Sequence, residues 1–243
     1  MERIDKILTS QGIGSRRDVH ALLRQGRVTV GDAVVRAADF KADAAAQVIC
    51  VDGAPLRYRR FMYIMMNKPP GVISATDDPR QRTVLDLLPQ PLRRRGLFPV
   101  GRLDKDTEGL LLLTDDGDYA HRVLSPRKGI DKLYEATVDG PIGEAEIAAF
   151  GAGLTLGDGT PCLPAGLQVL RPGDSPRVLV CIREGKFHQV KRMFRAVGRT
   201  VLTLRRIQIG ALPLDPKLAP GEFRELTDAE RDSVFCAQKQ VLQ

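Results

Sequence analysis

The stretch GRLDKDTEGLLLLT at residues 101–114 decides the fold prediction, because a loop dense in charges runs directly into an apolar strand. The run Leu110–Thr114 is typical of a short buried strand, and two glycines bracket the loop before it. Two interpretations fit this loop. Asp104 and Asp106 either cap a turn, as aspartate does in most loops, or place their charge at a functional site. Composition alone favours the turn.

Strand patterns continue on both sides of this stretch, with helical patterns between them. The segments Leu167–Leu170 and Arg177–Ile182 are separated by Arg-Pro-Gly-Asp, which predicts a hairpin. Strands joined by short turns and a few helices predict an α+β domain on a mixed, mainly antiparallel sheet. The further strand patterns are FMYIMMNK at 61–68, LYEATVDG at 133–140 and TVLTLRRIQIG at 200–210, and the helical patterns cover about 118–124, 142–150 and 188–197.

The first 60 residues have a pattern of their own. Apolar residues within Ile4–Leu8 fall at helical spacing and predict a short first helix. Ser15 is the expected N-cap of a second helix, with Asp18 three residues on as an approximate capping box and Gly26 as its end. The segment Val28–Val35 contains a Gly-Asp pair at its centre, which predicts a hairpin.

This N-terminal pattern resembles the S4 RNA-binding domain, in which two short helices present basic side chains to RNA. The text RIDKILTSQGIGSRRDVHALLRQGRVTVGD at residues 3–32 carries the resemblance. A generic helix–helix–hairpin scaffold with ordinary surface arginines is the alternative. RNA binding is favoured because the basic side chains fall on the expected polar faces. Those residues are Arg3, Lys6, Arg16, Arg17, Arg24 and Arg27.

Composition narrows the class of protein. The 243 residues are 43% hydrophobic, which is ample for a core, and 37 Lys+Arg against 30 Asp+Glu give a net charge of +7. No apolar run approaches the roughly 20 residues that span a bilayer, and the charged N-terminus has no secretory pattern, so we expect a cytoplasmic protein without membrane contact. The 4 Cys and 3 His are scattered, which argues against a disulfide framework and a local metal site.

A second dense segment, GKFHQVKRMF at residues 185–194, begins at a glycine and enters a predicted helix. Over Arg183–Arg206 there are eight basic residues and one acid, Glu184. A solvated basic face is the ordinary interpretation. Cations at a helix N-terminus oppose the macrodipole, however, so they favour an anionic partner. Together with the basic N-terminal unit, the segment indicates a phosphate-rich ligand.

Four ordered motifs resemble those of the S4-domain-containing rRNA pseudouridine synthases. The opening strand and loop are MNKPPGVISATDDPRQRTVLDLLP at 66–89, and the catalytic motif is GRLDKDTEGLLLLTDDGDYAHRVLSP at 101–126. DKLYEATVDG at 131–140 and REGKFHQVKRMFRAVGRTVLTLRRIQIG at 183–210 match the second and third motifs. The resemblance implies an S4-like domain at residues 1–58 and a catalytic domain at 62–243, with a linker at 57–61.

Within this family, SATDDP, HQVKRMF and LAPGEFRELT resemble most the enzymes that act on small-subunit, 16S, rRNA. The reaction breaks the N1–C1′ bond of a uridine, rotates the uracil and joins C5 to C1′. It is redox-neutral and implies neither cofactor nor metal. A uridine within folded rRNA must be flipped out to reach the pocket. The same reaction on 23S rRNA and a non-catalytic rRNA-binding or assembly factor are the alternatives.

The resemblance also implies roles for single residues. Asp104 would be the catalytic aspartate, by attack at C1′ or by elimination toward a glycal, and Lys191 its basic partner, where relatives often have Arg. Tyr134 would stack on the flipped base and is a candidate for the C5 proton transfer. Substrate-binding roles fall to Arg102, Lys132, Arg192 and Leu204, and RNA-binding roles to Lys186 and His188. The expected partner is rRNA, and nothing in the sequence calls for more than a monomer.

Overall fold

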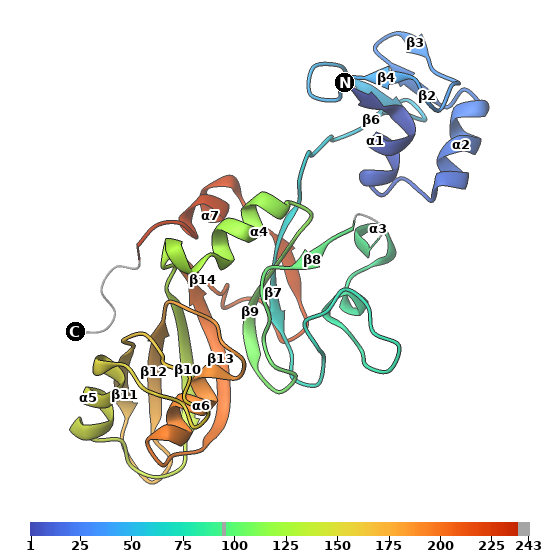
Figure 1. Ribbon diagram of the computed structural model, residues 1–243. Coiled ribbons are helices and arrows are strands. Elements are labelled where there is room, and N and C mark those ends of the chain that lie inside the picture. Colours follow the sequence, from blue (N-terminus) through green and yellow to red (C-terminus); the bar gives the residue numbers. More distant parts are fainter. Residues whose placement is uncertain (94–95, 238–243) are drawn as a thin grey trace. The chain divides into compact units, whose positions relative to one another are not determined.

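The computed structural model describes residues 1–93 and 96–237. The chain divides into two compact units, and each is described by itself (Figure 1). One comprises Met1–Met62 with Leu85–Phe98, and the other Tyr63–Val84 with Pro99–Gln243. The predicted domain boundary at residues 57–61 stays a prediction, and the predicted end of the catalytic domain, residues 238–243, lies outside the described residues.

The S4 unit, residues 1–62 of the first compact unit, contains two helices and short strands, as the resemblance implies. Its helices are α1 (Ile4–Ser10) and α2 (Arg16–Arg24). Strands β3 (Ala33–Val34), β2 (Val28–Val30), β5 (Ile49–Val51) and β6 (Ala54–Pro55) form one sheet in that order, and β1 (Glu2–Arg3) pairs with β4 (Lys41–Ala42). The core is formed by residues that include Ile4, Ile7, Leu8, Val19 and Leu23, all 0% exposed.

The capping box predicted at Ser15 is confirmed. The Asp18 backbone N–H donates to Ser15 Oγ at 3.3 Å, and the Ser15 backbone N–H donates to Asp18 Oδ2 at 2.9 Å. Such a cap contributes about 1 kcal/mol by satisfying backbone donors that the first turn leaves unpaired. The two bonds fix where α2 begins, and hence which basic side chains of its first turn face solvent.

The larger unit is built on one mixed sheet. Its main path runs β11-β12-β10-β13-β9-β7-β15, with β14 paired to β13. All neighbours in this path are antiparallel except β13 and β9, which confirms the mixed, mainly antiparallel sheet. The strands are β7 (Tyr63–Lys68), β9 (Glu108–Thr114), β10 (Lys132–Val138), β11 (Gly166–Arg171), β12 (Arg177–Ile182), β13 (Val201–Ile209), β14 (Leu212–Pro213) and β15 (Phe223–Glu225).

Helices cover this sheet at several places. Helix α5 (Glu144–Ala152) contacts β11, α6 (Gln189–Ala196) contacts β13 and α7 (Asp228–Ser233) contacts β14 (Figure 1). Predicted helix 142–150 begins later than expected, because the Gly143 backbone N–H donates to the Glu146 carboxylate at 2.9 Å and starts the helix there. The remaining helical segments of this unit are α4 (Gly117–Leu124) and η2 (Pro126–Lys128). The segment Leu85–Phe98 of the first unit contains α3 (Gln90–Arg93) and most of η1 (Val84–Leu87), and β8 (Phe98–Pro99) begins at its end.

The parallel contact between β13 and β9 is short and depends on a glycine. It pairs Arg205 with Glu108 and Arg206 with Gly109. Gly109 has a φ of +99°, and a Cβ on it would lie 2.2 Å from the Arg206 carbonyl oxygen. A side chain at this position therefore cannot fit without moving the backbone of β13. This two-residue contact joins the antiparallel group β11-β12-β10-β13 to the group β9-β7-β15.

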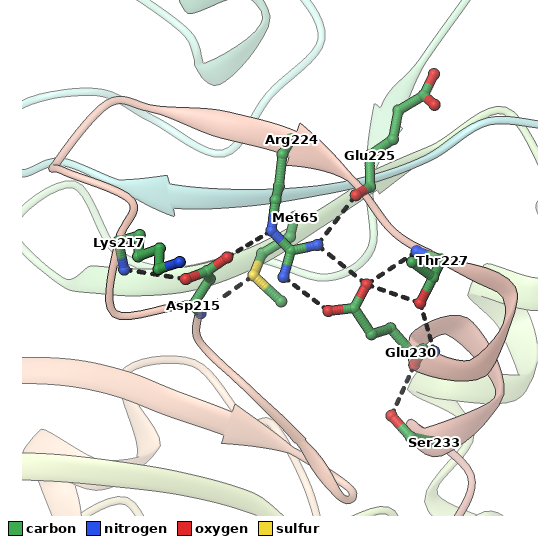
Figure 2. A network of polar contacts seen from close by, with 8 residues as sticks. All are labelled: Met65, Asp215, Lys217, Arg224, Glu225, Thr227, Glu230 and Ser233. Carbon is green, nitrogen blue, oxygen red and sulfur yellow. Dashed lines mark hydrogen bonds and ion pairs between the residues drawn. The ribbon is translucent and has the colours of Figure 1, made fainter.

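A polar network ties the C-terminal strand to α7 (Figure 2). Arg224 Nε donates to Asp215 Oδ2 at 2.6 Å, and its two terminal nitrogens donate to Glu230 at 2.7 and 3.0 Å. Glu230 also accepts from the Thr227 backbone at 2.9 Å, which caps α7. The hydrogen bond from Arg224 lowers the pKa of Glu230 to about 2. Figure 2 shows Arg224 held between the two carboxylates.

In the described part of the chain, no helix is long and apolar enough to cross a membrane.

Candidate active site

A buried lysine holds the backbone of the loop that carries Asp104. Lys68, at the end of β7, is 0% exposed. Its ammonium donates to the backbone carbonyls of Thr107 at 2.8 Å, Asp104 at 3.0 Å and Pro69 at 3.1 Å. Burial lowers the pKa of Lys68 to about 8. Since an unpaired buried ammonium is costly, the loop and the lysine stabilise each other.

Ser74 holds the same loop from a second side. Its hydroxyl donates to the Leu103 carbonyl at 2.9 Å, and the Leu103 N–H donates back to it at 3.0 Å. Asp104 therefore lies on a segment whose backbone is fixed at Leu103, Asp104 and Thr107. Neither Lys68 nor Ser74 was predicted from the sequence as a site residue. A lysine at the end of the apolar run YIMM was the available signal for the first.

The Asp104 carboxylate contacts two side chains from the segment that opens α6. Its Oδ2 lies 3.2 Å from Lys191 Nζ, and its Oδ1 lies 3.5 Å from His188 Nε2. Lys191 and His188 each contact a different oxygen of Asp104, so the carboxylate is oriented from two sides. The structure brings Asp104 and Lys191 together, as the resemblance implies. It also places His188, predicted only as an RNA-binding residue, at the same carboxylate.

Lys191 is shared between two aspartates. Its Nζ donates to Asp106 Oδ1 at 2.5 Å as well as contacting Asp104. Burial acts to lower the pKa of Lys191, but the hydrogen bonds to Asp106 and Asp104 outweigh it, and the pKa is raised. The hydrogen bond from Lys191 in turn lowers the pKa of Asp106. The lysine therefore carries its charge at neutral pH.

A pocket opens beside Asp104 and is walled by the sheet. Tyr134 of β10 and Leu204 of β13 both line it, and each is 7% exposed. Arg102, which is exposed, lies at the same pocket. Figure 1 shows β10 and β13 side by side, with α6 next to them. The pocket thus combines one carboxylate, one aromatic ring and one aliphatic side chain with cations nearby. Its further lining residues are Leu103, Thr107, Ile182, Gly185, Lys186, His188, Gln189 and Val190.

Two buried cations lie in the sheet next to Tyr134. Arg206 is 3% exposed, donates from Nε to the Leu110 carbonyl at 2.8 Å, and approaches the Tyr134 hydroxyl at 3.5 Å through Nη1. Lys132, 8% exposed, donates to the Ile130 carbonyl at 3.1 Å. Burial first, and the charge of Arg206 second, lower the pKa of Lys132 to about 8. Arg206 was not predicted from the sequence, because nothing in the strand pattern marks it as inward-facing.

Several predicted RNA-binding or substrate-binding cations have partners within the chain. Arg192 Nη2 pairs with Asp158 at 2.5 Å, and Lys186 Nζ pairs with Glu184 at 2.5 Å. In this structure Arg192 and Lys186 therefore each pair with a carboxylate of the protein itself, and the loop between α5 and β11 brings Asp158 against α6. Their contact with an external anion stays a prediction.

The basic side chains of the S4 unit that were predicted to bind RNA are exposed. Arg27 makes two hydrogen bonds to Asp52, at 2.5 and 2.6 Å, and Arg3 pairs with Asp5 at 2.8 Å. Lys6 and Arg16 line a surface hollow between α1 and α2, with His20 also at its wall. The remaining predicted side chains, Arg17 and Arg24, lie exposed on α2.

No group of three or more His, Cys, Asp or Glu side chains in residues 1–93 and 96–237 is arranged to hold a metal ion.

Comparison with known proteins defines the class to which this fold and pocket belong. Residues 62–196 match the model of the RNA pseudouridylate synthase family, and residues 2–48 match the S4 domain. The chain belongs to the RNA pseudouridylate synthase family, and it is therefore an isomerase that carries an S4 domain.

Relatives align over nearly the whole chain. An uncharacterized RNA pseudouridine synthase of Bacillus subtilis is 45% identical over 94% of this chain and 96% of its own length. The ribosomal small subunit pseudouridine synthase A of Escherichia coli is 42% identical over 96% of this chain and 99% of its own. A crystal structure of a pseudouridylate synthase, 35% identical, covers 96% of this chain and 100% of that chain with a TM-score of 0.67.

Proposed function

We propose that the protein converts a uridine of 16S rRNA into pseudouridine, with Asp104 as the catalytic carboxylate. The observation that carries the proposal is an aspartate 3.2 Å from a lysine, at a pocket walled by Tyr134 and Leu204. The choice of 16S rRNA is supported by the small-subunit enzymes of Escherichia coli and Salmonella typhimurium, each 42% identical over 96% of the chain.

The reaction is an isomerisation at one nucleotide. The N1–C1′ bond breaks, the uracil rotates, C5 joins C1′, and the proton lost from C5 is balanced by the one gained at N1. Attack at C1′ and elimination to a glycal both begin with the Asp104 carboxylate at the ribose. Lys191 and His188 hold that carboxylate through different oxygens, which reduces the motions available to it.

The freed uracil has to be retained while it turns. Tyr134 offers a ring face and Leu204 an aliphatic surface, so the base can rotate between them without losing contact. Tyr134 is the candidate for the C5 proton transfer, and Arg206 lies 3.5 Å from its hydroxyl. Arg102 is exposed at the pocket, which supports a role for it in binding a phosphate of the flipped nucleotide.

Flipping a uridine from folded rRNA costs a few kcal/mol, and contacts elsewhere must offset it. The S4 unit supplies exposed cations on both of its helices, Lys6 on α1 and Arg16, Arg17 and Arg24 on α2. Contacts from such cations to phosphates bind RNA without regard to sequence and weaken with salt. We assign the docking of rRNA to these two helices of the S4 unit. The expected cellular location of the protein is the cytoplasm.

The test is a position-resolved pseudouridine map of 16S and 23S rRNA from a strain that lacks the gene. Complementation with the wild type should restore a carbodiimide-dependent reverse-transcription stop in 16S rRNA, and Asp104→Asn should not, although it still binds rRNA in a gel shift. Asp118→Asn, an exposed carboxylate of the first turn of α4, is the matched control and should restore the stop. A stop restored only in 23S rRNA assigns the large subunit instead, and an active Asp104→Asn refutes the catalytic assignment.

A further inference from the structure

One aromatic side chain is left in water beside the pocket. Among the aromatic residues in the described part of the chain, only Phe40 and Phe187 are exposed, and Phe187, at 69%, is the more exposed. Burial of a phenylalanine side chain is favourable, but single exposed apolar side chains are common and do not by themselves indicate a ligand. The position of Phe187 at the pocket and the contacts of its neighbours are what point to a ligand.

Phe187 lies at the rim of the pocket. The residues on both sides of it, Lys186 and His188, line the pocket, and Phe187 itself is not among the lining residues. Its ring stacks on the His188 imidazole with centroids 3.8 Å apart and planes 18° from parallel. Since His188 contacts Asp104, a single imidazole separates the phenyl ring from the carboxylate.

The backbone on both sides of the ring is also held by hydrogen bonds. His188 has φ +48° and ψ +35°, a left-handed conformation that residues other than glycine rarely adopt. Arg192 Nη1 donates to the Phe187 carbonyl at 3.3 Å, and the Lys186 N–H donates to Gln189 Oε1 at 2.9 Å. The segment is therefore fixed on both sides of Phe187, and one face of its ring is covered by His188.

We propose that the free face of Phe187 stacks on the base of a nucleotide next to the flipped uridine. When one nucleotide leaves the stack, its neighbours lose a stacking partner, and aromatic side chains commonly replace it. Phe187 stands at the rim of the pocket that takes the target base, so its free face is open to a neighbouring nucleotide. The inference rests on the proposed function and adds to it that Phe187 positions the flanking nucleotide and takes no part in bond making.

The first test compares variants on an rRNA transcript that the wild type converts. Loss of one base–aromatic stack weakens binding by roughly 5- to 150-fold, so Phe187→Ala should raise KM by that factor and leave kcat unchanged. Phe187→Trp should behave as the wild type. Phe187→Leu should behave as Phe187→Ala, because it keeps apolar surface and lacks a ring. Leu170→Ala, 44% exposed on β11, is the control for loss of an exposed apolar side chain and should leave KM unchanged.

The second test removes the partner base. An RNA with an abasic nucleotide on the 5′ or the 3′ side of the target should show the raised KM with the wild type, on one side only, and no further rise with Phe187→Ala. An unchanged KM for Phe187→Ala, a wild-type KM for Phe187→Leu, or equal effects of the abasic site in both proteins overturns the inference. A wild type that forms no pseudouridine in any rRNA refutes the proposed function itself, which separates the two failures.

Discussion

Gly109→Ala tests the short parallel contact that joins the two parts of the sheet. The alanine Cβ would lie 2.2 Å from the Arg206 carbonyl oxygen, whereas real Cβ contacts essentially never fall below 3.0 Å, so the strands must separate by at least 0.8 Å. The obstructing atom belongs to the backbone, and a rotamer change cannot relieve the overlap. The backbone of β13 or β9 therefore has to move.

Gly71→Ala is the matched control for this substitution. Gly71 has a φ of +87°, close to the +99° of Gly109, and a Cβ there meets nothing within 4 Å. Both alanines carry the left-handed strain of about 1–2 kcal/mol. Gly109→Ala adds overpacking of about 1–3 kcal/mol and weakens hydrogen bonds worth about 0.5–1.5 kcal/mol each. We expect it to destabilise the protein by about 2–4 kcal/mol more than Gly71→Ala.

The measurement is urea unfolding of both variants and the wild type, followed by circular dichroism. Both glycines belong to the same compact unit, so the same transition reports on both. A difference of 2–4 kcal/mol is large against the 5–15 kcal/mol of a typical domain. If the two variants have the same free energy of unfolding within about 1 kcal/mol, the contact is not sterically fixed and the reasoning is wrong.

Three further predictions concern single charges. Lys191→Met should lower the single-turnover rate of pseudouridine formation about 10²-fold or more, as expected for loss of an oriented cation at a reacting group. Lys191→Arg should recover part of the lost rate, and an unchanged rate for Lys191→Met would contradict the pairing of Lys191 with Asp104. Lys68→Met should reduce the rate on saturating RNA because four backbone carbonyls, among them that of Asp104, lose their donor, and full activity would show that the loop holds itself. Glu230, with a pKa lowered from 4.5 to about 2, adds stability that is present above pH 4.5 and is lost as the pH falls toward 2. Glu230→Gln should therefore make the melting temperature fall less steeply as the pH is lowered through this range. A fall as steep as that of the wild type would contradict the pairing of Glu230 with Arg224.

Local sequence patterns were sufficient for most of the elements. The cap at Ser15 was predictable because it depends on residues three positions apart. The hairpin of β11 and β12 was predictable because its turn residues lie between two apolar runs. The parallel pairing of β13 with β9 was not predictable, since it joins residues about a hundred positions apart. The only local sign of it in the sequence is a glycine, Gly109.

The candidate site shows the same division. Resemblance of motifs brought Asp104, Lys191 and Tyr134 forward, and they do line or adjoin one pocket. Lys68 and Arg206 were not predicted, because both are buried and donate to backbone carbonyls that lie far away in the sequence. A sequence does not show which charged side chains point inward. Arg192 was expected at the substrate, and its pairing with Asp158 depends on a loop whose course no local pattern fixes.

The two-residue contact between β9 and β13 has a consequence for the order in which the protein folds. The parallel contact joins residues about a hundred positions apart, so a long loop must close before the two groups meet. Asp104 and Lys68 belong to one group, and Tyr134, Lys191 and Leu204 belong to the other. The ion pair between Asp104 and Lys191 therefore forms only once both groups have met, so that a partly folded chain has all the chemical groups of the pocket and no pocket in which to use them.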